Sequence, residues 1–177
     1  DFAWEMPVKV FTMGENKWNE YEDWPVPGAT EVPYFLGSDR GANSAAGDGR
    51  LVPAPTGEPG ARDVFPYDPA DPVPTRGGGN CCWPSVLRWG PMDQAEVESR
   101  DDVLVYSTGP LEQDVRVTGP VEAVLFVSTT AESTDFTAKL VDVHPNGFAM
   151  NLTDGIRRIV ARRPADEPTR HEATEVV

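Results

Sequence analysis

The sequence feature that most limits the fold is a stretch rich in proline and glycine, residues 37–91. Ten glycines and nine prolines fall within its 55 positions. Proline removes a backbone donor and glycine weakens regular elements, so we expect neither a long helix nor a long strand there. Large apolar side chains are nevertheless spread through it, among them Leu51, Phe65 and Trp89. We therefore expect this coil to pack, either on the domain's own sheet or on a neighbouring domain.

The clearest β signal lies further along the chain. Residues 103–106 form a short apolar run, and residues 114–118 alternate polar and apolar side chains, as in a half-buried strand. Residues 122–128 are apolar almost throughout, as expected for a strand that is buried on both faces. Gly119-Pro120 separates the second run from the third. These runs predict three strands joined by turns.

A β-hairpin is predicted next. Apolar and polar residues alternate from Phe136, but the alternation slips at Leu140-Val141, which predicts a β-bulge. Residues 144–147 read His-Pro-Asn-Gly and predict a hairpin turn centred on the Asn-Gly pair. Residues 153–155 predict a second turn, which leads into a strand over 156–163.

The N-terminal region has weaker signals. Residues 8–13 are rich in β-branched and aromatic side chains and predict a strand, and residues 32–36 predict a second, shorter strand. Between them, residues 16–24 predict a short acidic helix, capped by Asn16 and stopped by Pro25.

Strands at this spacing, with almost no helical periodicity, predict an all-β fold of the sandwich or jelly-roll type. We divide the chain into residues 1–36 as a linker with the first strands, 37–100 as a packed coil, and 101–177 as the β-sandwich core. Residues 174–177 look like the start of another strand, so we expect the core to be truncated and the natural chain to continue.

Charge excludes several classes of partner. The net charge is −14, from 15 basic and 29 acidic residues, and a nucleic-acid or anionic-membrane surface needs clustered basic residues. No apolar run approaches the roughly 18 residues that a membrane span needs. Cys81 and Cys82 are adjacent, so they can close only a strained disulfide. The pair favours a reduced protein, and we predict a cytoplasmic location.

Catalytic motifs are lacking. No serine lies in a Gly-x-Ser-x-Gly segment, and the two histidines, His144 and His171, fall in a turn and in a polar tail. Gly77-Gly78-Gly79 lacks the lysine and the helix of a phosphate-binding loop, and two thiols fall short of a structural zinc site. We predict no catalytic residue, no cofactor and no metal site in this chain.

Tryptophans are the remaining candidates. Trp18 and Trp24 belong to the segment of the predicted acidic helix and suit a docking surface, although core burial explains them equally well. Trp83 and Trp89 lie in the proline-rich coil. We take these four as candidates for a domain interface. An alternative is a carbohydrate-binding module, in which tryptophan rings stack on sugars.

Read together, several segments resemble the C-terminal domain of X-Pro dipeptidyl-peptidases and their CocE/NonD relatives. The strongest are Asp101 to Leu111 (DDVLVYSTGPL), Val117 to Val121 (VTGPV), Asp135 to Gly147 (DFTAKLVDVHPNG) and Asn151 to Ile156 (NLTDGI). Similar text also occurs at residues 10–18, 23–25, 77–82 and 90–94. The resemblance covers residues 7–163.

This resemblance implies a galactose-binding-like jelly roll that packs against an α/β-hydrolase domain and a helical cap. It also implies a parent enzyme that hydrolyses esters or amides with a Ser-Asp-His triad located before this domain. The jelly roll of the family continues beyond the region of residues 175–177. Our first hypothesis is thus a non-catalytic segment that buttresses the catalytic domain, shapes the substrate entrance and supports a homo-oligomer; the carbohydrate-binding module is the second.

Overall fold

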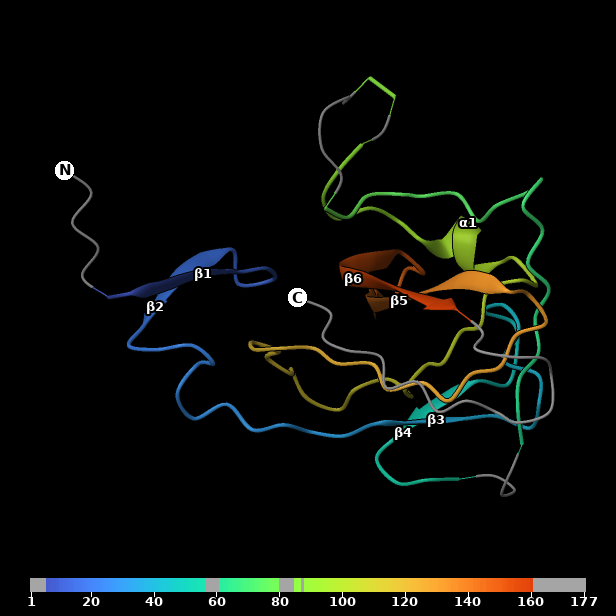
Figure 1. Ribbon diagram of the computed structural model, residues 1–177. Helices are drawn as coiled ribbons and strands as arrows, with labels where there is room; N and C mark the ends of the chain where they lie inside the picture. Colours follow the sequence, from blue (N-terminus) through green and yellow to red (C-terminus); the bar gives the residue numbers. More distant parts are fainter. Residues whose placement is uncertain (1–5, 57–60, 80–84, 87, 161–177) are drawn as a thin grey trace.

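The computed structural model describes residues 6–56, 61–79, 85–86 and 88–160. Within these ranges the strands pair into three two-stranded antiparallel sheets, β1–β2, β3–β4 and β5–β6 (Figure 1). The elements are β1 (Val8–Thr12), β2 (Lys17–Tyr21), β3 (Phe35–Gly37), β4 (Arg50–Val52), α1 (Ala95–Glu98), β5 (Ser133–Val143) and β6 (Ala149–Val160). The all-β prediction is confirmed, and the jelly-roll topology stays a prediction.

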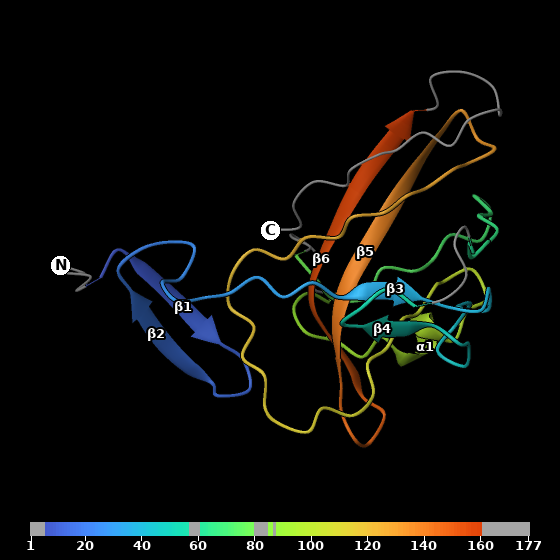
Figure 2. The same ribbon diagram turned by 90° about the horizontal axis from the view of Figure 1, so that it is seen from below.

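The β5–β6 hairpin is the longest regular unit, and Figure 2 shows its two strands running side by side. The His144 amide donates to the Phe148 carbonyl at 2.9 Å, and Gly147 takes a φ of 85°. The register shifts between Leu140 and Val141, so both the predicted turn and the predicted bulge are confirmed. The turn predicted at 153–155 is wrong, because Gly155 pairs with Ala138 inside a continuous strand.

The short helix predicted at residues 16–24 is also wrong. Lys17–Tyr21 is strand β2, and Gly14 and Asn16 turn the chain with φ values of 83° and 54°. Pairing with β1 sets Phe11 opposite Trp18. A cross-strand aromatic pair of this kind stabilises the strand conformation, whereas a cap on a short helix offers little in water.

Four other predicted strands are shorter than expected, irregular or absent from the described structure. The strand predicted at 32–36 is β3, three residues long and shifted toward Gly37. Residues 103–107 are extended and are held by isolated bridges to the loop before β4 and to β4 itself. Residues 114–118 and 122–128 form no named strand in the described part of the chain. In 122–128 alternate side chains are exposed, so burial on both faces is wrong.

The proline-rich coil packs on the β5–β6 sheet. The ring of Phe65 meets that of Phe136, on β5, edge to face at 6.3 Å between centroids. Gly49 allows another close approach, because a Cβ there would collide with the carbonyl oxygen of Val105. Among the described residues no helix is long and apolar enough to cross a membrane.

Candidate domain interface

Most large apolar side chains are accessible to solvent. Among the described residues 23 large apolar side chains are exposed, whereas four apolar residues form the buried core. The four are Ala42, Val97, Ala149 and Ile159. Soluble monomers rarely leave contiguous apolar surface uncovered, and large exposed patches mark interaction sites.

The β1–β2 hairpin has two different faces. Lys9 and Phe11 lie opposite Glu20 and Trp18, so these four side chains share one face, and all four are exposed. The Phe11 and Trp18 rings meet edge to face at 5.4 Å, and Lys9 Nζ lies 2.9 Å from a Glu20 carboxylate oxygen. This face therefore presents an aromatic pair beside an ion pair.

The predicted interface tryptophans are exposed wherever they are described. Trp18 is 57% exposed, Trp24 is 45% exposed and Trp89 is 51% exposed, so none of these three is a core residue. Trp83 lies outside the described residues. The structure places Trp24 just after β2 and Trp89 in the coil before α1. Their role at an interface stays a prediction.

A buried amide ties the β5–β6 hairpin to the segment before α1. Gln94 is 1% exposed, and its Nε2 donates to the carbonyls of Arg76 and Met92 and to Asn151 Oδ1 at 3.0 to 3.2 Å. Its Oε1 accepts from Lys139 Nζ at 2.9 Å. Asn151, on β6, also accepts from the Met92 amide at 2.7 Å. We call Gln94, Asn151 and Lys139 the Gln94 cluster.

A carboxylate anchors the proline-rich coil. Asp63 accepts hydrogen bonds from Ser38 Oγ at 2.6 Å, from the Tyr106 hydroxyl at 2.7 Å and from the Ala42 amide at 3.1 Å. Burial alone would raise the pKa of Asp63, but these three donors together lower it. Burial, and next the hydrogen bond to Asp63, raise the pKa of Tyr106. Asp63 therefore joins three segments that are distant in sequence.

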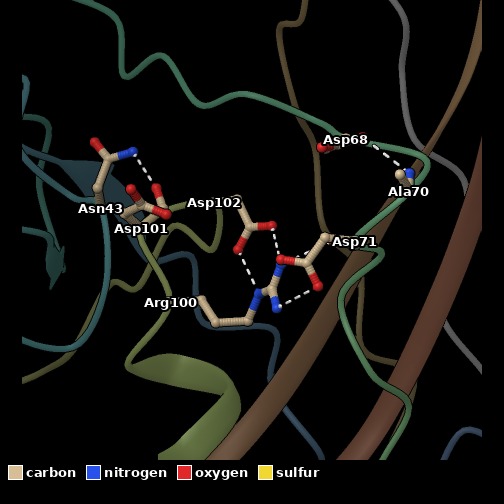
Figure 3. A network of polar contacts seen from close by, with 7 residues as sticks. All are labelled: Asn43, Asp68, Ala70, Asp71, Arg100, Asp101 and Asp102. Carbon is tan, nitrogen blue, oxygen red and sulfur yellow. Dashed lines mark hydrogen bonds and ion pairs between the residues drawn. The ribbon is translucent and has the colours of Figure 1, made fainter.

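An arginine joins the same coil to the chain after α1. Figure 3 shows the Arg100 guanidinium between the carboxylates of Asp102 and Asp71, with N–O distances of 2.6 and 3.2 Å. Hydrogen bonds with Asp102 and Asp71 raise the pKa of Arg100. In the same view Asn43 Nδ2 donates to the Asp101 carbonyl at 2.8 Å. Arg100 thus links Asp71, in the coil, to the chain after α1.

Potential reactive groups are dispersed. No group of three or more histidine, cysteine, aspartate or glutamate side chains in the described residues could hold a metal ion. His144 lies at the β5–β6 turn, with Nε2 3.4 Å from an Asp142 carboxylate oxygen and its ring against Phe148. His171, Cys81 and Cys82 lie outside the described residues.

Three important residues escape the sequence patterns. Phe11 joins the exposed aromatic face through the register of β1 and β2, which hairpin pairing could have suggested. Gln94 and Asp63 act through partners as far as 57 and 43 positions away in the chain. One sequence carries no local signal for such contacts.

Comparisons with known proteins agree on one family. The family model described as the X-Pro dipeptidyl-peptidase C-terminal non-catalytic domain matches residues 2–177. The chain is 46% identical, over 173 residues, to the cocaine esterase of Rhodococcus sp. (strain MB1 Bresler). It is 32% identical over 173 residues to proteins named "Putative serine esterase" in Mycobacterium bovis and Mycobacterium tuberculosis.

These relatives are much longer than the matched segment. The match covers 96% of this chain but 29% of the Rhodococcus protein, and 93% of this chain but 24% of each mycobacterial protein. The segment that matches is thus a minor part of each relative.

Proposed function

Because the chain belongs to the family of X-Pro dipeptidyl-peptidase C-terminal non-catalytic domains, we propose that it serves a larger serine hydrolase of the CocE type. In this proposal the parent polypeptide hydrolyses ester or amide bonds, and its Ser-Asp-His triad lies outside these residues. The domain braces the α/β-hydrolase and cap domains and shapes substrate access. The adjacent cysteines further support a cytoplasmic location, and a homo-oligomer is compatible with the proposal.

The observation that carries this proposal is the imbalance between core and exposed apolar surface. Burying one large apolar side chain contributes roughly 1.5–3 kcal/mol. With 23 such side chains exposed among the described residues, the domain gains much stability by packing on another domain. We assign Trp18, Trp24, Trp83 and Trp89 to that interface. Tryptophan is among the residues that contribute most to binding when an interface covers them.

A hydrolysis assay tests the proposal. The full polypeptide should hydrolyse p-nitrophenyl acyl esters or aminoacyl-proline substrates, and a serine-directed inhibitor should abolish the turnover. The 177-residue chain alone should show no turnover that responds to the inhibitor. Inhibitor-sensitive turnover by the chain alone would refute a non-catalytic role, and an inactive full polypeptide would refute the hydrolase assignment.

The exposure of Trp89 supports the carbohydrate-binding module as a second candidate, because a sugar-stacking ring must be accessible. A glycan array separates the two functions. Specific glycan binding that Trp89→Ala abolishes and Tyr67→Ala retains would favour the module, since both side chains are exposed in the coil. Absence of binding would favour the bracing role.

A further inference from the structure

The β1–β2 hairpin stands apart from the other two sheets of the described structure. Figures 1 and 2, seen from two directions, both show it separated from the β3–β4 and β5–β6 sheets. Its two strands make their main contacts with each other. An isolated two-stranded hairpin is marginally stable in water and needs a further surface to pack on. We therefore expect a surface outside the described residues to cover this hairpin.

One face of the hairpin suits such a partner. Phe11 and Trp18 are 43% and 57% exposed, and their edge-to-face packing holds both rings in place before any partner binds. On the opposite face Val8, Val10 and Tyr21 are half-buried. The exposed rings are thus presented together on a preformed surface, which lowers the entropic cost of docking.

An ion pair sets the direction in which the hairpin points. Arg116, in the extended segment 114–118, pairs with Glu15 in the β1–β2 turn and also interacts with Tyr21. Tyr21 belongs to the half-buried face, so Arg116 contacts the hairpin from the side opposite the aromatic pair. The Phe11–Trp18 face is left open to solvent.

We propose that the β1–β2 hairpin is a docking arm: its Phe11–Trp18 face binds the catalytic part of the same polypeptide, and Arg116 is the residue that positions it. The inference rests on the proposed function above. On the catalytic part, the partner surface consists of an apolar patch that receives the two rings. Polar groups flank this patch and contact the Lys9–Glu20 ion pair.

Two observations favour the catalytic part over a second copy of the domain. The chain carries a net charge of −14, so two copies repel each other at moderate ionic strength. In the Rhodococcus relative most of the length lies outside the matched segment, and the family name places that segment at the C-terminal end. The preceding part is tethered next to β1, which gives it a high effective concentration at the hairpin.

Photocrosslinking in the full polypeptide tests the contact. The photoreactive residue p-benzoylphenylalanine replaces Trp18 in one sample, and it replaces Lys17 in a matched control. Lys17 is exposed on the same strand but belongs to the other face. After irradiation, mass spectrometry of the peptides should show crosslinks from position 18, at several times the yield from position 17, to residues that precede this domain.

Variants test the positioning role of Arg116 and the contribution of Trp18 to the stability of the full polypeptide. Arg116→Ala should reduce the crosslink yield from position 18 severalfold, and Arg116→Lys should restore part of it. Trp18→Ala should speed thermal inactivation of the full polypeptide roughly tenfold. Phe35→Ala is the control, because Phe35 is similarly exposed but lies on β3.

Three results would overturn the docking arm. They are crosslinks that join two copies of the polypeptide, crosslinks confined to this domain, and a yield from position 18 no higher than from position 17. A polypeptide that shows no inhibitor-sensitive hydrolysis defeats the proposed function instead. An active polypeptide with misplaced crosslinks defeats the docking arm alone.

Discussion

The β5–β6 and β1–β2 hairpins differ in the contacts that attach them to the rest of the domain. The β5–β6 hairpin receives side chains from distant segments, with Gln94 bonded to Asn151 and Phe65 packed on Phe136. The β1–β2 hairpin is tied to the described body by the ion pair between Arg116 and Glu15, both exposed. Exposed ion pairs contribute little, typically 0–1 kcal/mol. One hairpin is therefore fixed by its own domain, and the other has its aromatic face available.

This contrast shows that a well-formed turn does not decide how firmly a hairpin is held. Both hairpins turn at residues with positive φ, Gly14 and Asn16 in one and Gly147 in the other. Stability beyond the turn comes from packing and from satisfied buried polar groups. Two kinds of variant test this contrast. Substitutions at the anchors of the β5–β6 hairpin should lower its stability strongly, whereas substitutions in the aromatic pair of the β1–β2 hairpin should lower stability only slightly.

Gln94→Ala should have the largest effect. It leaves the Arg76 carbonyl and other partners of Gln94 without the amide and opens a cavity, so we expect local stability of the β5–β6 hairpin to fall by about 3 kcal/mol. Hydrogen exchange of the Ala149 and Asn151 amides in the full polypeptide measures this. Gln113→Ala is the control, because Gln113 is exposed; equal losses in both variants would show that the Gln94 cluster does not anchor the hairpin.

Asp63→Asn should have the next largest effect. The amide replaces a carboxylate that accepts from Ser38 and Tyr106, and its NH₂ group would face their hydroxyls. Hydrogen bonds to a charged acceptor are worth about 1.5–3 kcal/mol, so we expect a loss of about 2 kcal/mol in the stability of the coil. Exchange of the Ala42 amide, which donates to Asp63, reports it. Asp68→Asn is the control, because the Asp68 carboxylate accepts within its own turn.

The same carboxylate gives the coil a defined pH dependence. The pKa of Asp63 is lowered from its ordinary value of 3.8, so its stabilising contribution is present above pH 3.8 and is lost as the pH falls through the lowered pKa. Protection of the Ala42 amide should therefore decrease in acid in the wild type. An Asp63→Asn variant that shows the same acid loss would assign the effect to another group.

The anchored hairpin, β5–β6, is also the hairpin that the sequence predicts best. Alternation along Phe136 to Leu140, its slip at Val141 and the Asn-Gly turn specify β5, the bulge and the hairpin. These signals are local, because strand alternation and turn chemistry act over a few residues. What anchors the hairpin was not predicted, since Gln94 and Asp63 depend on how distant segments meet.

The helix predicted at residues 16–24 and the turn predicted at 153–155 are wrong for the same physical reason. Residues 17–21 pair with β1 as a strand although their local pattern favours a helix. Gly155 pairs with Ala138 inside a strand although residues 153–155 favour a turn. In both cases cross-strand hydrogen bonds outweigh weak local propensities. Residues 122–128 show the reverse, since Val124 and Phe126 are exposed although their pattern is that of a buried strand. A buried pattern without burial agrees with the proposal that further surfaces cover this domain.

Substituting the aromatic pair of the β1–β2 hairpin should have the smallest effect on stability. Phe11→Ala, Trp18→Ala and the double variant form a cycle, and we expect a coupling energy of about 0.5–1 kcal/mol from one edge-to-face pair at a hairpin surface. Exchange of the Asn19 amide in the 177-residue chain measures it, with the Lys9–Glu20 pair as a matched cycle. A coupling of several kcal/mol would mean that the rings are already buried within this chain. The docking arm would then lack the accessible face on which it depends.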